Sequence, residues 1–222
     1  MLPPMPATAN PPLPYPPPFQ YTDRASKARY IAAKYAAILS TNLLDVGCDQ
    51  RQLLTHLPPT VRYTGLDIAP PADVVLNLDL PGTVLPFPDR HFDTVLAADV
   101  LEHLERIHAI FDEFCRVAAE RVVISLPNPV HNFIDALTAG RGGRLKFYGL
   151  PIDPPKDRHR WFFGAEEAAQ FLRERGARNG FQVEQLDQDT PGCPKWPGPE
   201  GRNYLSSPNI TAGTTWCVLR RT

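Results

Sequence analysis

Segment 43–54, LLDVGCDQRQLL, constrains the fold more than any other part of the chain. It begins as an apolar run, passes through Asp45 and Gly47, and then changes to a helical pattern. A buried strand that turns sharply into a helix is the first unit of an open, parallel α/β sheet. In such sheets ligands bind beyond the carboxyl ends of the strands, so the turn at Gly47 is a candidate ligand-binding turn.

Two further apolar segments also end in an aspartate. The segment YTGLDI predicts a second strand that ends at Asp67, and VVLNLD (74–79) predicts a third that ends at Asp79. Because parallel strands end at the same edge of a sheet, we expect these carboxylates to lie near the turn at Gly47. Three acids in this order suit a ligand that carries amines, a ribose and an adenine.

The remaining chain continues to alternate between strands and helices. We expect further strands at about 92–97, 121–127, 181–187 and 214–221, and helices at about 23–39, 50–57, 103–118, 131–138 and 165–178. The link 68–73 is too short for a full crossover helix. Near-continuous apolar strands between helices indicate an α/β fold with a parallel sheet covered on both faces.

The composition limits the classes of function. With 222 residues, 43% of them hydrophobic, the chain suits one domain with a sizeable core. The formal net charge of −1 provides no basic field, so we expect no nucleic-acid partner, and no apolar run is long enough to span a membrane. The four cysteines form no C-x-x-C pair, and the N-terminus has no signal-peptide pattern. We therefore expect reduced thiols, no zinc site and a cytoplasmic protein.

Segments rich in proline and glycine separate the expected domain from a tail and two insertions. Residues 1–22 form a proline-rich N-terminal tail that we expect to be disordered, with a docking peptide as the alternative. Residues 23–222 are expected to form a single domain, in which 128–163 and 188–213 are Pro/Gly-rich insertions on the substrate side.

The set of motifs carries a family resemblance. The turn DVG (45–47), the acids Asp67 and Asp79, and the LPF…FD…LEH pattern of 85–104 resemble class I S-adenosylmethionine-dependent methyltransferases, in particular the type-11 group. The resemblance extends over most of the chain, from residue 25 to residue 187. It implies a Rossmann-like, doubly wound, mostly parallel seven-stranded sheet with a terminal antiparallel strand, and S-adenosyl-L-methionine as cofactor.

The resemblance also implies the cofactor-binding residues. Asp67 would accept the ribose hydroxyls, and Asp79 the adenine amine beside apolar neighbours. The full expected set is Asp45, Gly47, Cys48, Asp67, Ile68, Asp79, Leu80 and Asp99. For Cys48 a packing role is favoured over that of a nucleophile.

The glycine turn departs from the family pattern. The type-11 pattern is acid-x-Gly-x-Gly-x-Gly, and here Asp49 and Arg51 stand at the second and third glycines. Asp49 is placed to face the ammonium group of the methionine moiety, and Arg51 to pair with its carboxylate. The departure also leaves open an alternative, a non-catalytic binding or scaffold protein with a degenerate cofactor loop. A nicotinamide-dependent oxidoreductase is a weaker alternative, because DVGCDQRQ does not supply G-x-G-x-x-G.

Two histidines are the candidate catalytic residues. His103 follows the fourth strand, and His159 begins an H-x-x-F-F segment that resembles one near the active site of type-11 enzymes. Either imidazole is a candidate base for an oxygen acceptor, with a structural histidine as the alternative for His103. Asp99-x-x-Glu102-His103 also resembles the E-x-x-E-H arrangement of some metal-dependent methyltransferases, but its first acid is shortened, and we expect no metal.

Acceptor choice is assigned to the insertion 128–163. Its basic and aromatic side chains suit an anionic or ring-bearing acceptor. These residues are Phe133, Arg141, Arg144, Lys146, Phe147, Tyr148, Lys156, Arg158, Arg160, Trp161 and Phe162. The chain has no Asn-Pro-Pro-Tyr tetrapeptide, which many enzymes that methylate amino groups carry. We therefore expect methyl transfer to oxygen or carbon of a small-molecule, lipid or sugar acceptor.

Overall fold

A computed structural model describes residues 21–39, 41–189 and 207–222. The strands are β1 (Asn42–Val46), β2 (Arg62–Asp67), β3 (Val74–Val75), β4 (Phe92–Ala98), β5 (Ala118–Pro127), β6 (Phe181–Asp189) and β7 (Thr214–Arg221). The α-helices are α1 (Arg24–Lys34), α2 (Ile107–Val117), α3 (Pro129–Thr138), α4 (Ala165–Arg178) and α5 (Pro208–Thr211). Two short 3₁₀ helices are η1 (Gln52–His56) and η2 (Leu101–His103).

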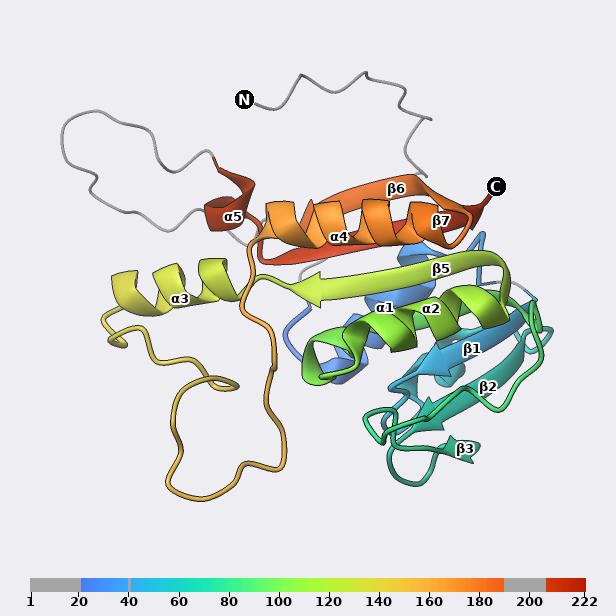
Figure 1. Ribbon diagram of the computed structural model, residues 1–222, viewed down its shortest axis with the longest axis horizontal. Coiled ribbons are helices and arrows are strands. Elements are labelled where there is room, and N and C mark those ends of the chain that lie inside the picture. Colours follow the sequence, from blue (N-terminus) through green and yellow to red (C-terminus); the bar gives the residue numbers. More distant parts are fainter. Residues whose placement is uncertain (1–20, 40, 190–206) are drawn as a thin grey trace.

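The strands form one seven-stranded sheet in the order β3-β2-β1-β4-β5-β7-β6 (Figure 1). The pairs β1–β2, β1–β4, β2–β3 and β4–β5 are parallel, whereas β7 runs antiparallel to β5 and β6. The expected doubly wound sheet with a terminal antiparallel strand is therefore confirmed. The strand order reverses between β1 and β4, which is the position where open α/β sheets bind their ligands.

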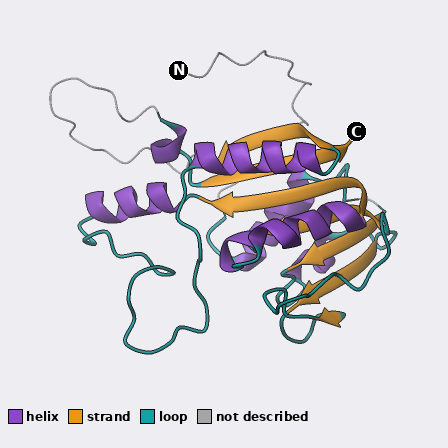
Figure 2. Ribbon diagram, in the orientation of Figure 1, coloured by secondary structure: helices purple, strands orange, loops and turns teal. Residues whose placement is uncertain are grey.

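The two faces of the sheet carry separate hydrophobic clusters. Alternate strand residues point to opposite faces, so Leu44 and Val95 pack with α2 and α4, while Leu43 and Leu96 pack with α1 and η1. The helices thus cover both faces (Figure 2), as the apolar strands predicted. On the α1 side Trp216 is fully buried among aromatic rings, including Tyr21 at a centroid distance of 6.4 Å.

Several predicted elements are shorter than expected. The predicted third strand 74–79 is wrong beyond Val75, because the Asn77 side chain accepts a hydrogen bond from Asp79 N (2.9 Å) and turns the chain out of the sheet. Helix 50–57 is only the 3₁₀ helix η1, and the first helix ends at Lys34 rather than Leu39.

Of the other predicted elements, some have the expected boundaries and some do not. The predicted helix 103–118 begins only at Ile107, as α2, and the 3₁₀ helix η2 precedes it, while α5 was not expected. In contrast, α4 and β7 span 165–178 and 214–221 as predicted. No full helix connects β2 to β3.

At the carboxyl edge of the parallel strands, the segment after β4 contacts the long loop between α3 and α4, where Arg160 N donates to Glu102 O at 2.8 Å. Val46 pairs with Ala97, so Gly47 and Asp99 both follow their strands at this edge. β5 points toward the same end of the molecule, where α3 and the following loop extend from the sheet (Figure 1).

Some predictions concern segments that the structure does not describe. The expected tail up to residue 20, and 190–206 within the predicted insertion 188–213, lie outside the described residues. Within the described ranges, no helix is both long and apolar enough to cross a membrane.

Candidate functional site

The turn after β1 requires glycine at position 47. Gly47 has a φ of 73°, in the left-handed region, and its amide donates to Leu66 O at 2.8 Å. A Cβ atom at this position would lie 2.5 Å from Val100 Cγ2. The turn after β1 therefore packs directly against the segment that follows β4, and a side chain at position 47 would separate them.

Asp49 and Arg51 preserve the shape of a glycine loop without glycine. Their φ values of 47° and 58° are both left-handed. Their side chains point to partners within the protein: Asp49 pairs with Arg24 at 2.7 Å, and Arg51 with Asp73 at 2.9 Å. These two ion pairs connect the loop to α1 and to the β2–β3 link, and the expected contacts of Asp49 and Arg51 with the methionine moiety stay a prediction.

Asp45 and Cys48 are buried beneath this turn. Tyr63 Oη donates a hydrogen bond of 2.7 Å to Asp45 Oδ2, and burial raises the pKa of Asp45 to about 7. Burial likewise raises the pKa of the Cys48 thiol to about 12. Because the thiolate is the reactive form, this value supports the packing role of Cys48 over a nucleophilic one.

Two carboxylates at this edge stand beside exposed apolar side chains. Asp67 accepts hydrogen bonds from the amides of Asp49 (2.8 Å) and Ile68 (2.7 Å), which fix its orientation. Asp79 accepts a longer bond from Arg106 N at 3.3 Å. The next residues along the chain, Ile68 and Leu80, are 64% and 55% exposed. Carboxylate acceptors beside uncovered apolar surface fit a ribose and a flat ring.

Asp99, directly after β4, is held by a lysine from α1. Asp99 has a left-handed φ of 56°, forms an ion pair with Lys27, and accepts a hydrogen bond from Ser125 Oγ. Although burial opposes ionisation, the Lys27 ammonium and these hydrogen bonds lower the pKa of Asp99. Lys27 Nζ also lies 5.4 Å from the centre of the Trp216 ring. Lys27 therefore joins α1 to the carboxyl edge of the sheet.

The structure brings the two predicted histidines together around Glu102. The rings of His103 and His159 meet edge to face with centroids 4.6 Å apart, and Phe147 stacks on His159 at 4.5 Å. Burial and the neighbouring Asp99 raise the pKa of Glu102 well above its usual value. Burial, together with His103, lowers the pKa of His159 to about 4, so this imidazole is neutral at pH 7.

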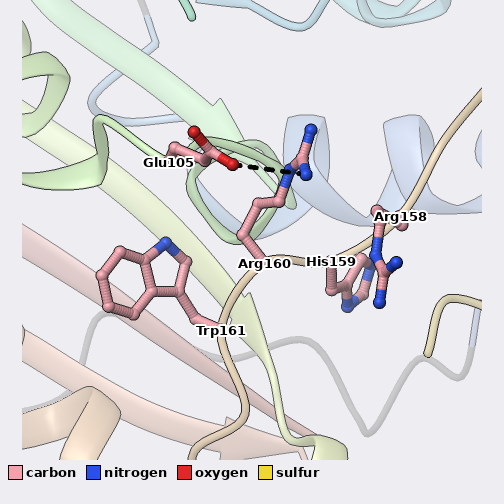
Figure 3. A pocket seen from close by; sticks show the side chains of 5 residues that line it. All are labelled: Glu105, Arg158, His159, Arg160 and Trp161. Carbon is pink, nitrogen blue, oxygen red and sulfur yellow. Dashed lines mark ion pairs between the residues drawn. The ribbon is translucent and has the colours of Figure 1, made fainter. Parts of the chain in front are cut away.

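A cavity of about 450 Å³ opens beside His159 (Figure 3). Its walls are Glu105, Arg158, His159, Arg160 and Trp161, and an ion pair of 3.4 Å joins Arg160 to Glu105. Trp161 Nε1 donates to Leu104 O at 2.7 Å, which fixes the indole to the segment that follows η2. Basic and aromatic groups thus line a space next to the histidine pair.

Comparison with known proteins identifies the family. The family described as methyltransferase domain matches residues 20–186, which include every predicted cofactor-binding and catalytic residue. The chain belongs to this family. It is an S-adenosylmethionine-dependent methyltransferase, as the resemblance of its motifs implied. No curated protein matches the methyltransferase in sequence.

Solved structures share the fold at low sequence identity. Magnesium protoporphyrin IX methyltransferase from Synechocystis PCC 6803, with bound SAH, has a TM-score of 0.51 at 16% identity over 89% of this chain and 83% of its own. A SAM-dependent methyltransferase from Archaeoglobus fulgidus has a TM-score of 0.54 at 14% identity over 89% and 94%. The [4+2]-cyclase SpnF has a TM-score of 0.54 at 15% identity over 89% and 81%.

The residues present fit the cofactor of the family. The exposed Ile68 and Leu80 beside Asp67 and Asp79 fit an adenosine group, and the left-handed turn at Gly47 keeps the backbone accessible. Asp99 directly follows β4 and precedes Val100, the residue that packs against the turn at Gly47. The structure therefore places all the predicted cofactor residues of this methyltransferase along one edge of the sheet.

Sequence reasoning missed several groups of the site. Lys27 gave no signal beyond its position in the predicted helix 23–39. Tyr63 lies in a strand in which only the terminal aspartate was singled out. Asp157, 2.7 Å from His103 Nδ1, stands two residues before His159, and the predicted loop offered no geometry with which to place it.

Proposed function

We propose that this methyltransferase transfers a methyl group to an oxygen atom of a small acceptor that is anionic or aromatic. The observation that carries the proposal is the position of His159, which lines the cavity of Figure 3 and lies against His103 at the carboxyl edge. Arg158 and Arg160 suit an acceptor with an acidic group, and Trp161 suits one with a ring.

The chain's own residues would perform binding, orientation and proton removal. When bound, the cofactor supplies a methyl group on a sulfonium, which is already an activated leaving group, so alignment and exclusion of water are the main requirements. The buried imidazole of His159 is neutral at pH 7 and can accept the proton of an acceptor hydroxyl. The new bond joins the acceptor oxygen to the methyl carbon as the carbon–sulfur bond breaks.

A panel of acceptors tests this proposal. The full chain would be incubated with S-adenosylmethionine and phenols, hydroxy acids, sugars, fatty acids or amines, and S-adenosylhomocysteine would be measured by mass spectrometry. We expect turnover with hydroxyl or carboxyl acceptors that falls by about 100-fold in His159→Gln. The exposed His56, on η1, offers the matched control His56→Gln, which should retain activity. Turnover confined to amines would contradict the oxygen assignment.

A second candidate is a binding protein that retains the fold without methyl transfer. It is favoured by the ion pairs Arg24–Asp49 and Lys27–Asp99, which engage the carboxylates in the turns after β1 and β4. SpnF, whose fold is similar, is named as a cyclase, so a similar fold occurs in a protein that is not named as a methyltransferase. Binding of S-adenosylhomocysteine without turnover on any acceptor would favour this candidate.

A further inference from the structure

Three side chains bring nitrogen and oxygen atoms close together next to the cavity. His103 Nε2 lies 3.7 Å from Glu102 Oε1, and His159 Nε2 lies 4.0 Å from the same oxygen. One ligand-type atom of each residue lies within 4.8 Å of the others. Ligands of a tetrahedral ion with bonds of about 2.1 Å are separated by roughly 3.4 Å, so a small inward movement would bring these atoms to coordination distance.

Glu102 is the central observation. Its side chain is fully buried, and among the described residues neither carboxylate oxygen has a hydrogen-bond partner. Buried carboxylates are normally paired, hydrogen-bonded or bound to a metal ion. The nearby Lys27 does not supply the missing partner, because its ammonium group is paired with Asp99.

The outer nitrogens of both imidazoles face oxygen atoms. His103 Nδ1 lies 2.7 Å from Asp157 Oδ1, and His159 Nδ1 lies 3.3 Å from Tyr148 Oη. A histidine that binds a metal through Nε2 commonly directs its other ring nitrogen to a carboxylate or another oxygen. Phe147 also stacks on the His159 ring, with only 9° between the planes, and limits its rotation.

We propose that Glu102, His103 and His159 form a divalent-cation site at the edge of the acceptor cavity. Two imidazoles and one carboxylate suit Zn²⁺, Mn²⁺ or Co²⁺ better than Mg²⁺, which prefers oxygen ligands. Asp99, the first acid of the Asp99-x-x-Glu102-His103 pattern, is not a ligand because Lys27 and Ser125 occupy its oxygens. The third ligand comes instead from the distant loop residue His159. This proposal departs from the sequence-based expectation of no metal.

The cation site also refines the acceptor chemistry. Three protein ligands leave coordination positions open, and an oxygen of the acceptor can fill one of them. A bound cation would lower the pKa of an acceptor hydroxyl. His103 and His159 would then be ligands, and this role would replace that of His159 as the base in the proposed function. This role of the ion rests on the proposed function, whereas the cation site itself does not.

Cobalt binding tests the site without cofactor or acceptor. The full chain would be titrated with Co²⁺ alone, and binding would be followed by calorimetry and by visible absorption, which reports nitrogen ligation. We expect one equivalent to bind, and Glu102→Gln and His159→Gln to weaken binding by at least about 100-fold. Asp157→Asn changes an exposed side chain that contacts His103 from outside the ligand set, and should weaken it by about 10-fold. His56→Gln is the control.

The outcomes separate this proposal from the proposed function. Binding that is lost in the two ligand variants and retained in His56→Gln supports the cation site, whether or not methyl transfer is found. Absence of Co²⁺ binding at millimolar concentration, equal binding in all variants, or loss in His56→Gln would overturn it. Methyl transfer that persists in a chelator would overturn only the role of the ion in acceptor ionisation.

Discussion

Asp45 illustrates how a buried carboxylate adjusts to its surroundings. It lies within β1 beneath the turn at Gly47, and its hydrogen-bond donor is the Tyr63 hydroxyl. This neutral donor compensates only partly for burial, which raises the pKa to about 7. Below this pH the group is protonated in the folded protein, although in the unfolded chain it ionises near its usual value of 3.8.

The raised pKa of Asp45 predicts a pH-dependent stability. The folded state holds a proton that the unfolded chain releases, so the stabilisation is complete near pH 4 and is lost as the pH rises through about 7. Asp45→Asn lacks this titration. Between pH 5 and pH 8 its free energy of unfolding should therefore fall less than that of the wild type, and the difference between the two falls should be no more than about 4 kcal/mol. Urea unfolding at both pH values measures the difference. Parallel pH profiles for the two proteins would contradict the assigned pKa.

The helix α1 is the element that connects the N-terminal segment to the site. Asp23 caps it by accepting a bond of 2.7 Å from Ser26 N, and its buried side packs against η1 and the sheet. From this helix Lys27 reaches Asp99 at the carboxyl edge. The sequence predicted a helix over 23–39, and α1 lies within that range. The lysine contact was not predicted, because it depends on how the helix lies across the strands.

The contact between α1 and β4 predicts the effect of removing Lys27. Lys27→Met leaves the Asp99 carboxylate beside Glu102 without its cation, and should lower the free energy of unfolding by about 1–3 kcal/mol at pH 7. The exposed Arg29 lies on the same helix, so Arg29→Met removes the same charge without this contact and should change stability by less than about 0.5 kcal/mol. Chemical denaturation compares the three proteins, and equal losses in both variants would refute a specific role for Lys27.

Periodicity explains which elements could be predicted. The strands β1, β2, β4 and β7 and the helix α4 have clear apolar patterns, and the structure contains them close to the expected positions. The length of β3 was overestimated because Leu76 and Leu78 continue the apolar pattern of the strand, although Asn77 makes a turn there. The predicted acids and histidines gather at one edge because parallel strands end together. Their partners could not be predicted, since loop residues such as Asp157 have no periodicity.

The whole molecule assembles its site from segments far apart in the chain. The turn after β1, the end of β2, the turn after β4 and the loop before α4 meet at one edge of the sheet, and α1 lies beside them. Only the doubly wound strand order makes these segments neighbours. We therefore expect this edge to bind S-adenosylmethionine even though Asp49 and Arg51 replace two glycines of the loop.

Titration calorimetry with S-adenosylhomocysteine tests cofactor binding at this edge. We predict micromolar binding to the full chain, and binding weakened by about 10–100-fold in Asp67→Ala, because a carboxylate that accepts hydrogen bonds from the ribose is lost. Asp89→Ala removes an exposed carboxylate that pairs with Arg116, and should bind as the wild type does. Absence of binding at millimolar concentration, or equal binding by the wild type and Asp67→Ala, would contradict the account.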